Sequence, residues 1–194
     1  MLDSFAYWTL TDFIEETQPS SNVFHGGLGL FTYNGIKKPH YYALQYIARL
    51  GNEMIDCGDG YFITKSHGCI QVMLYNYQHF NHLFASGEQF DMSFTKRYTP
   101  FSTMGLLDIT IEFVELPTVV CTIRERYINQ KSGSAFDEWV RMGGLPLTEA
   151  DSMYLRAVTE PKLTVHIANI TNGRLVLSAS LEPLEVRFIE IQFQ

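Results

Sequence analysis

Hydrophobic and polar residues alternate along most of the chain that follows Gly51. The clearest case is 107–113, where every second side chain is hydrophobic, and this pattern is typical of a strand with one buried face. Similar runs predict strands over 61–65, 69–75, 119–127, 162–167, 174–180 and 185–193. The Asn172-Gly173 pair predicts a hairpin between the strands on either side of it. Short strands joined by turns predict a mainly β fold, an antiparallel β-sandwich.

A different pattern precedes Gly51. Residues 4–10 form a short hydrophobic run, which predicts a strand buried on both faces, and residues 11–37 then have the composition of a long loop. Pro39 opens a helix that Gly51 ends. The chain is therefore predicted to hold a strand-loop-helix unit over residues 1–51 and a β-sandwich domain over residues 52–194.

Two short helices are predicted between the strands. Ser134 has the position of an N-cap for a helix that runs to Met142 and stops at Gly143. Thr148 and Asp151 form a capping-box-like pair at the start of the second helix, which ends near Val158.

Composition and charge narrow the classes of partner. The net charge is -7 and the basic residues are scattered, so direct nucleic-acid binding by this chain is not expected, because neutralising phosphates needs a clustered positive face. No hydrophobic run approaches the roughly 20 residues of a membrane span, so no membrane partner is expected. The three cysteines, Cys57, Cys69 and Cys121, lack metal-ligand spacing. They are read as reduced thiols of a cytoplasmic protein, and no cofactor is predicted.

Trp8, Glu15 and Glu16 make the best candidate site. An indole face stacks on the C–H face of a sugar ring, while carboxylates accept hydrogen bonds from its hydroxyl groups, and paired carboxylates also drive glycoside hydrolysis. The alternative from residue types alone is that Trp8 belongs to a hydrophobic core and that the glutamates are a solvated pair on a loop.

Two other motifs favour structural roles. The glycine-rich stretch 25–30 lacks the dinucleotide pattern and no helix begins at its glycines, so we interpret it as a tight loop in which backbones approach closely. His79 and His82 could share a helical face as metal ligands, but no third ligand is evident nearby. A polar connection between strands is favoured there, and no metal site is predicted.

The N-terminal block closely resembles glycoside hydrolase family 39, the β-xylosidase family. The residues that carry the resemblance are Tyr7-Trp8-Thr9, Asp12, Glu15-Glu16, Phe24-His25-Gly26-Gly27, Gly29-Leu30 and Asn34-Gly35-Ile36-Lys37-Lys38-Pro39. Weaker matches continue through Tyr75-Asn76-Tyr77, 134–139 and 181–183 with Val186.

The resemblance implies that residues 1–51 are the remnant of a catalytic (β/α)8 barrel, its last strand, loop and helix, followed by the sandwich. It implies that Trp8 and Glu16 line a sugar subsite. It also implies that the acid/base and nucleophile glutamates lie on earlier barrel strands, upstream of this chain, so no residue here is assigned a catalytic role. The parent is then expected to be a glycosidase that binds a xyloside-like sugar, and this chain alone is expected to be inactive.

A second context is an AraC-type transcription regulator. The segments 84–88 and 94–101 are similar to family-39-like modules of such regulators, where the barrel would sense a sugar or act as a scaffold. A stand-alone sugar-binding sandwich is a third interpretation. Without the other units of the barrel, Phe5, Tyr7, Trp8 and the Tyr42/Tyr46 stripe are expected to form an exposed hydrophobic patch that drives self-association, with pairing through the edges of the orphan barrel strand.

Overall fold

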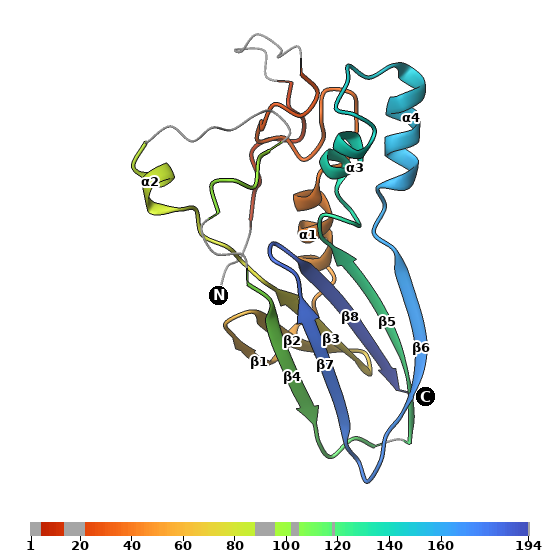
Figure 1. The fold of residues 1–194 in the computed structure, drawn as a ribbon. Coiled ribbons are helices and arrows are strands. Elements are labelled where there is room, and N and C mark those ends of the chain that lie inside the picture. The colour runs from red at the N-terminus through yellow and green to blue at the C-terminus, as the bar shows by residue number, and fades with distance from the viewer. Residues whose placement is uncertain (1–4, 14–21, 88–95, 102–104, 118, 194) are drawn as a thin grey trace.

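The structure is a computed structural model that describes residues 5–13, 22–87, 96–101, 105–117 and 119–193. Two antiparallel sheets dominate it (Figure 1). The larger has the strand order β1-β2-β3-β8-β5-β6 and the smaller pairs β4 with β7. The strands are β1 (Glu53–Gly58), β2 (Tyr61–Ser66), β3 (Cys69–Tyr75), β4 (Leu107–Phe113), β5 (Val120–Ile128), β6 (Leu163–Asn169), β7 (Leu175–Leu181) and β8 (Val186–Phe193).

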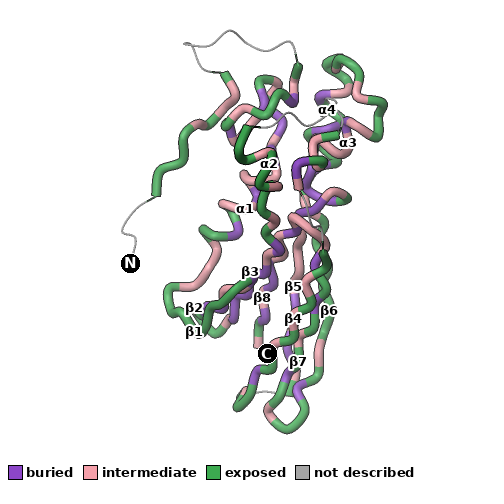
Figure 2. The backbone as a smooth tube through the Cα atoms, turned by 60° about the vertical axis from the view of Figure 1, so that its left-hand side comes forward, coloured by how far each residue is buried: buried purple, intermediate pink, exposed green. Residues whose placement is uncertain are grey.

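The two sheets face each other across the main hydrophobic core. The core side chains come from both sheets, with Val72, Leu74 and Ile191 from the larger and Phe113 and Leu181 from the smaller. Each smaller-sheet strand alternates buried or half-buried positions with exposed ones, as 107–113 predicts. The predicted mainly β, antiparallel sandwich is therefore confirmed. Figure 2 shows the buried positions concentrated along the inner strands.

Helix α1 (Pro39–Ile47) covers the other face of the larger sheet. Its buried side chains are Tyr42 and Tyr46, which pack with Met73, Ile128 and Phe188 of the sheet. The Tyr46 and Phe188 rings stack with centroids 5.2 Å apart. Tyr42 and Tyr46 are thus in a core, and the prediction that they contribute to an exposed patch is wrong. The domain boundary at residue 51 stays a prediction.

The remaining helices are α2 (His82–Ala85), α3 (Ala135–Arg141) and α4 (Glu149–Val158). Ser134 caps α3 by accepting from the Asp137 amide, and Thr148 and Asp151 form a complete capping box at α4, both as predicted. Nowhere in the described ranges is there a helix with the length and hydrophobicity that crossing a membrane would need.

The strand predicted over 4–10 does not form in its described part. Residues 5–10 lack strand pairing, and the segment makes a single parallel bridge further on, between Thr11 and Phe31. A strand of a parallel sheet needs neighbouring strands on its edges, and the described residues supply none here. Self-association through this segment stays a prediction, and Phe5, Trp8 and Leu10 are exposed.

The hairpin predicted at Asn172-Gly173 is half right. Both residues have positive φ, 52° and 70°, and Thr171 bridges Arg174, so the tight turn is present. The strands it joins lie in different sheets, however, because β6 pairs with β5 and β7 pairs with β4. The turn carries the chain from one layer of the sandwich to the other.

Candidate functional site

Trp8 lies on the surface, with 75% of its area exposed. Within this chain Trp8 is therefore not part of a hydrophobic core. An indole exposed to this extent can present a ring face to a ligand, as stacking on a sugar requires. Glu15 and Glu16, the other two candidate residues, lie outside the described residues, so their positions relative to Trp8 are not given.

The segment that carries Trp8 is held by the second half of the long loop. Leu30 donates its amide to the Thr9 carbonyl at 3.1 Å, and Phe31 donates to that of Leu10 at 3.0 Å. The Asp12 amide returns a hydrogen bond to Phe31 at 2.9 Å. These backbone contacts place the residues that follow Trp8 directly against the glycine-rich stretch.

Two glycines make this approach possible. A Cβ atom at Gly29 would overlap with the backbone of Thr11 and Asp12, and one at Gly27 would overlap with the Asp12 carboxylate and the His25 ring. Any larger residue would push the two chain segments apart. The prediction of a tight loop with closely approaching backbones is thus confirmed.

Asp12 sits at the centre of this junction with a fully buried side chain. Its Oδ1 accepts from the Gly29 amide at 2.9 Å and from Lys38 Nζ at 2.5 Å. Lys38 Nζ also donates to the Gly27 carbonyl at 2.8 Å. Within the described residues Asp12 Oδ2 has no hydrogen-bond donor, and His25 Nε2 lies 3.8 Å from it. The Asp12–Lys38 pair therefore ties the start, middle and end of the loop together.

His40 forms a second connection between this junction and α1. Its Nε2 lies 2.8 Å from the Gly29 carbonyl oxygen, and its ring centroid is 5.5 Å from that of Tyr7. Burial lowers the pKa of His40 below its ordinary value, and the charge of Lys38 acts in the same direction. The hydrogen bond to Gly29 and the Asp12 carboxylate oppose this shift. Since the pKa falls, the imidazole is neutral at pH 7.

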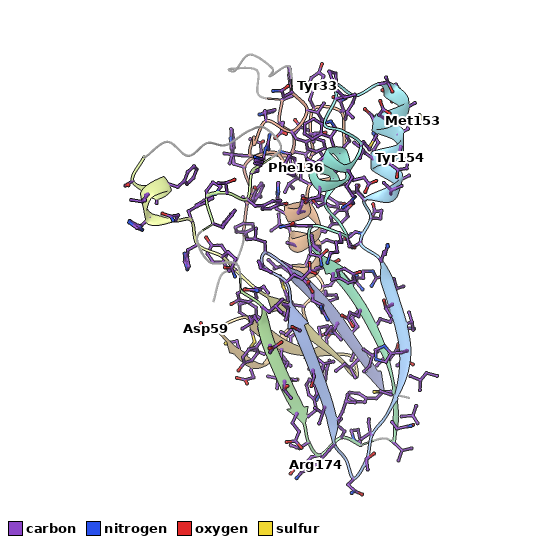
Figure 3. All side chains as sticks on the ribbon, viewed as in Figure 1. Tyr33, Asp59, Phe136, Met153, Tyr154 and Arg174 are labelled. Atoms are coloured by element: carbon purple, nitrogen blue, oxygen red, sulfur yellow. The ribbon has the colours of Figure 1, made fainter. Side chains whose placement is uncertain are left out.

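The outer side of the loop packs on α3 and α4. Phe24 and Ile36 share a buried cluster with Ala135, Trp139 and Leu155. The Phe24 ring lies 5.5 Å from Trp139 and 6.1 Å from Phe136, which points from α3 towards the loop (Figure 3). Trp139 is buried in this cluster, and its Nε1–H donates to the Leu145 carbonyl at 2.7 Å. Trp139 is therefore a packing residue. The loop is anchored on both of its sides.

Among the described residues, this arrangement positions side chains and shows no acid/base pair for hydrolysis. Asp12 is committed to Lys38 and Gly29, and the other carboxylates of the candidate site are not described. In the part of the chain that the structure describes, no three His, Cys, Asp or Glu side chains gather as a metal site would require. His82 begins the four-residue helix α2.

Asp12 and Lys38 were not predicted as partners. They lie 26 residues apart, and nothing in their spacing indicates a contact. The available signal was indirect, because glycines that allow a close backbone approach also leave room for a buried side chain between the segments.

The family model described as glycosyl hydrolases family 39 matches residues 1–176. A β-xylosidase of Geobacillus stearothermophilus is 27% identical over 192 residues, which are 98% of this chain and 34% of the relative. An uncharacterised HTH-type transcriptional regulator of Staphylococcus aureus (strain MRSA252) is 22% identical over 193 residues, which are 98% of this chain and 24% of the regulator. The chain thus spans about a third or less of the length of these relatives.

A solved structure has the same fold. The crystal structure of a monomeric β-xylosidase from Caulobacter crescentus CB15 superposes with a TM-score of 0.78 at 22% identity, over 97% of this chain and 37% of that one. The family match covers most of the chain, and it includes Trp8 and the Asp12–Lys38 junction. The chain belongs to glycosyl hydrolases family 39.

Proposed function

We propose that the chain is the C-terminal part of a β-xylosidase-type glycoside hydrolase and that it supplies the sugar-contacting end of the active site. The observation that supports this most is the similarity of 98% of the chain to one third of a β-xylosidase. In this proposal the Trp8 indole stacks on the sugar ring, while Glu15 and Glu16 accept hydrogen bonds from its hydroxyl groups.

The same proposal assigns no catalytic residue to this chain. Retaining hydrolysis needs two carboxyl groups about 5 to 5.5 Å apart on opposite sides of the scissile bond. Glu15 and Glu16 are adjacent on one loop, a placement that does not straddle a sugar. The acid and the nucleophile are expected from an earlier part of the parent protein, so the chain alone is not expected to hydrolyse a sugar. The proposed chemistry needs no metal or cofactor.

The test uses a parent protein that contains this chain. Trp8→Ala is expected to lower kcat/KM for an aryl β-xyloside by at least about tenfold, because stacking on the sugar is lost. Tyr77→Ala is the matched control, since Tyr77 is an aromatic residue with 66% of its surface exposed and belongs to no candidate site. Equal effects of the two substitutions would contradict the role of Trp8.

The second candidate function is a sugar-responsive module of an AraC-type regulator. It is favoured by the similarity of nearly the whole chain to the staphylococcal regulator. Trp8 and Glu16 suit a sugar sensor as well as a hydrolase, so activity of the parent must separate the two. DNA binding that changes with sugar, in a parent without xyloside hydrolysis, would establish the regulator and contradict the hydrolase.

A further inference from the structure

Strand β6 forms one edge of the six-stranded sheet (Figure 1). Leu163, Val165 and Ile167 share one face of it and are 48%, 51% and 69% exposed. Burial of hydrophobic side chains that stand in a row on an edge strand favours association. This edge is distinct from the surface around Trp8.

Within the described residues, alternate backbone groups of β6 point away from β5, at the positions of these three side chains. The Ile170 amide donates to the Val119 carbonyl at 2.8 Å, which makes this a hydrogen-bonded pair of the β5–β6 ladder. In an antiparallel ladder every second residue points its N–H and C=O at the neighbour, so the register directs those of Thr164, His166 and Ala168 towards β5. Those of Leu163, Val165 and Ile167 point outward from the sheet.

The opposite edge of the same sheet is protected, and β6 is not. Strand β1 carries Glu53 and Asp56 and has a register shift between Met54 and Asp56. Charges and bulges of this kind block edge-to-edge pairing. Strand β6 pairs with β5 in continuous register, and 163–169 contains neither proline nor any Asp, Glu, Lys or Arg.

We propose that β6 pairs antiparallel with β6 of a second copy of this chain, about a two-fold axis at Val165. This register places Leu163 opposite Ile167 of the partner subunit and Val165 opposite its own counterpart. Each outward-pointing pair then exchanges both backbone hydrogen bonds. The hydrophobic pattern reads the same in both chain directions around Val165, which favours a second copy over an unrelated peptide.

Charges are compatible with this register. Lys162 faces Ala168 and His166 faces Thr164, so no like charges stand directly opposite each other. Arg124 and Arg126 lie on β5, the strand that pairs with β6 on the side away from the partner copy. The two β5 strands would be three strand spacings apart, about 14 Å, which exceeds the screening length of about 8 to 10 Å at physiological salt.

The proposed pairing also limits the assembly to two copies. A two-fold contact uses the same edge in both copies, and the edge left at each end of the joined sheet is the protected β1. A dimer is therefore expected, without growth into a filament.

Sedimentation equilibrium of the chain over a range of concentrations tests the proposal. The wild type is expected to show a reversible monomer–dimer equilibrium. Val165→Lys places two ammonium groups across the axis and should weaken dimerisation at least about tenfold. Val176→Lys is the control, because Val176 is 58% exposed on β7 of the smaller sheet and should leave the equilibrium unchanged.

Amide hydrogen exchange of the wild type gives a readout that needs no variant to fold. The amides of Leu163, Val165 and Ile167 should become protected as the concentration rises and the dimer fills. A monomer at all concentrations would overturn the proposal. So would a dimer in which these amides stay unprotected, or one that Leu10→Ser abolishes while Val165→Lys does not, since the patch around Trp8 would then be the interface.

Discussion

Lys38 donates from Nζ to Asp12 Oδ1 across 2.5 Å, and only 10% and 0% of the two side chains are exposed. The pair joins the segment that follows Trp8 to the N-cap residue of α1. Since the Gly27 carbonyl and the Gly29 amide bind the same two side chains, one buried ion pair holds four points of the loop.

Breaking this ion pair should be costly. Asp12→Ala leaves the Lys38 ammonium buried without its counter-charge, and we expect the free energy of unfolding to fall by about 3 to 5 kcal/mol. Urea denaturation of the wild type and the variant measures the difference. Lys37→Ala is the control, because Lys37 pairs with Glu160 on the surface, where such a pair contributes about 0 to 1 kcal/mol. Losses of equal size at both positions would contradict the role of the Asp12–Lys38 pair.

Gly29 should be intolerant of any side chain. Gly29→Ala places a methyl group into the backbone of Thr11 and Asp12, so the loop must separate from the segment that carries Trp8. Overpacking of this kind costs about 1 to 3 kcal/mol or more. Gly105→Ala has open space around it and should change the unfolding free energy by less than about 1 kcal/mol. Thermal unfolding of both variants compares them, and a stable Gly29→Ala would disprove the close approach.

His40 should make stability depend on pH. Its pKa is lowered in the folded state, chiefly by burial, so the unfolded chain binds a proton first as the pH falls below about 6.5. The contribution of neutral His40 to stability is therefore present above that pH and is lost as the pH drops towards the folded pKa. His40→Gln should flatten the dependence of Tm on pH below about 6.5. Equal slopes for the wild type and His40→Gln would contradict this account.

The two tryptophans should be distinguishable by fluorescence. Trp8 is 75% exposed and Trp139 is 5% exposed, so acrylamide should quench the emission of Trp8 far more strongly. Trp139→Phe isolates the exposed residue and Trp8→Phe isolates the buried one. Similar quenching of the two variants would show that Trp8 is shielded in solution.

Local patterns predicted most of the sandwich. The alternation of 107–113 matches β4, and the strands predicted over 61–65 and 69–75 match β2 and β3. Strand β1 was not predicted, because all its residues are exposed and its sequence shows no alternation. The sheet partners of β6 and β7 could not be read from the turn between them, because turn geometry is local and the choice of sheet depends on distant strands.

The candidate site was predicted in outline. Sequence pattern indicated the tight glycine loop and the resemblance indicated Trp8, and the structure shows the loop and an exposed indole. The burial of Asp12 with Lys38 and His40 could not be predicted. It depends on three segments that meet only when the loop folds back on itself, and hydrophobic periodicity carries no information about such polar contacts.

An aryl β-xyloside assay of the chain tests most directly the central claim that this chain carries no catalytic group for sugar hydrolysis. The wild type, Trp8→Ala and Glu16→Gln should be purified in parallel, so that a contaminating hydrolase gives the same rate in all three preparations. The account predicts that none of them releases the aryl group faster than the buffer blank. Turnover by the wild type that Glu16→Gln abolishes would contradict it, because Glu16 would then be a catalytic group.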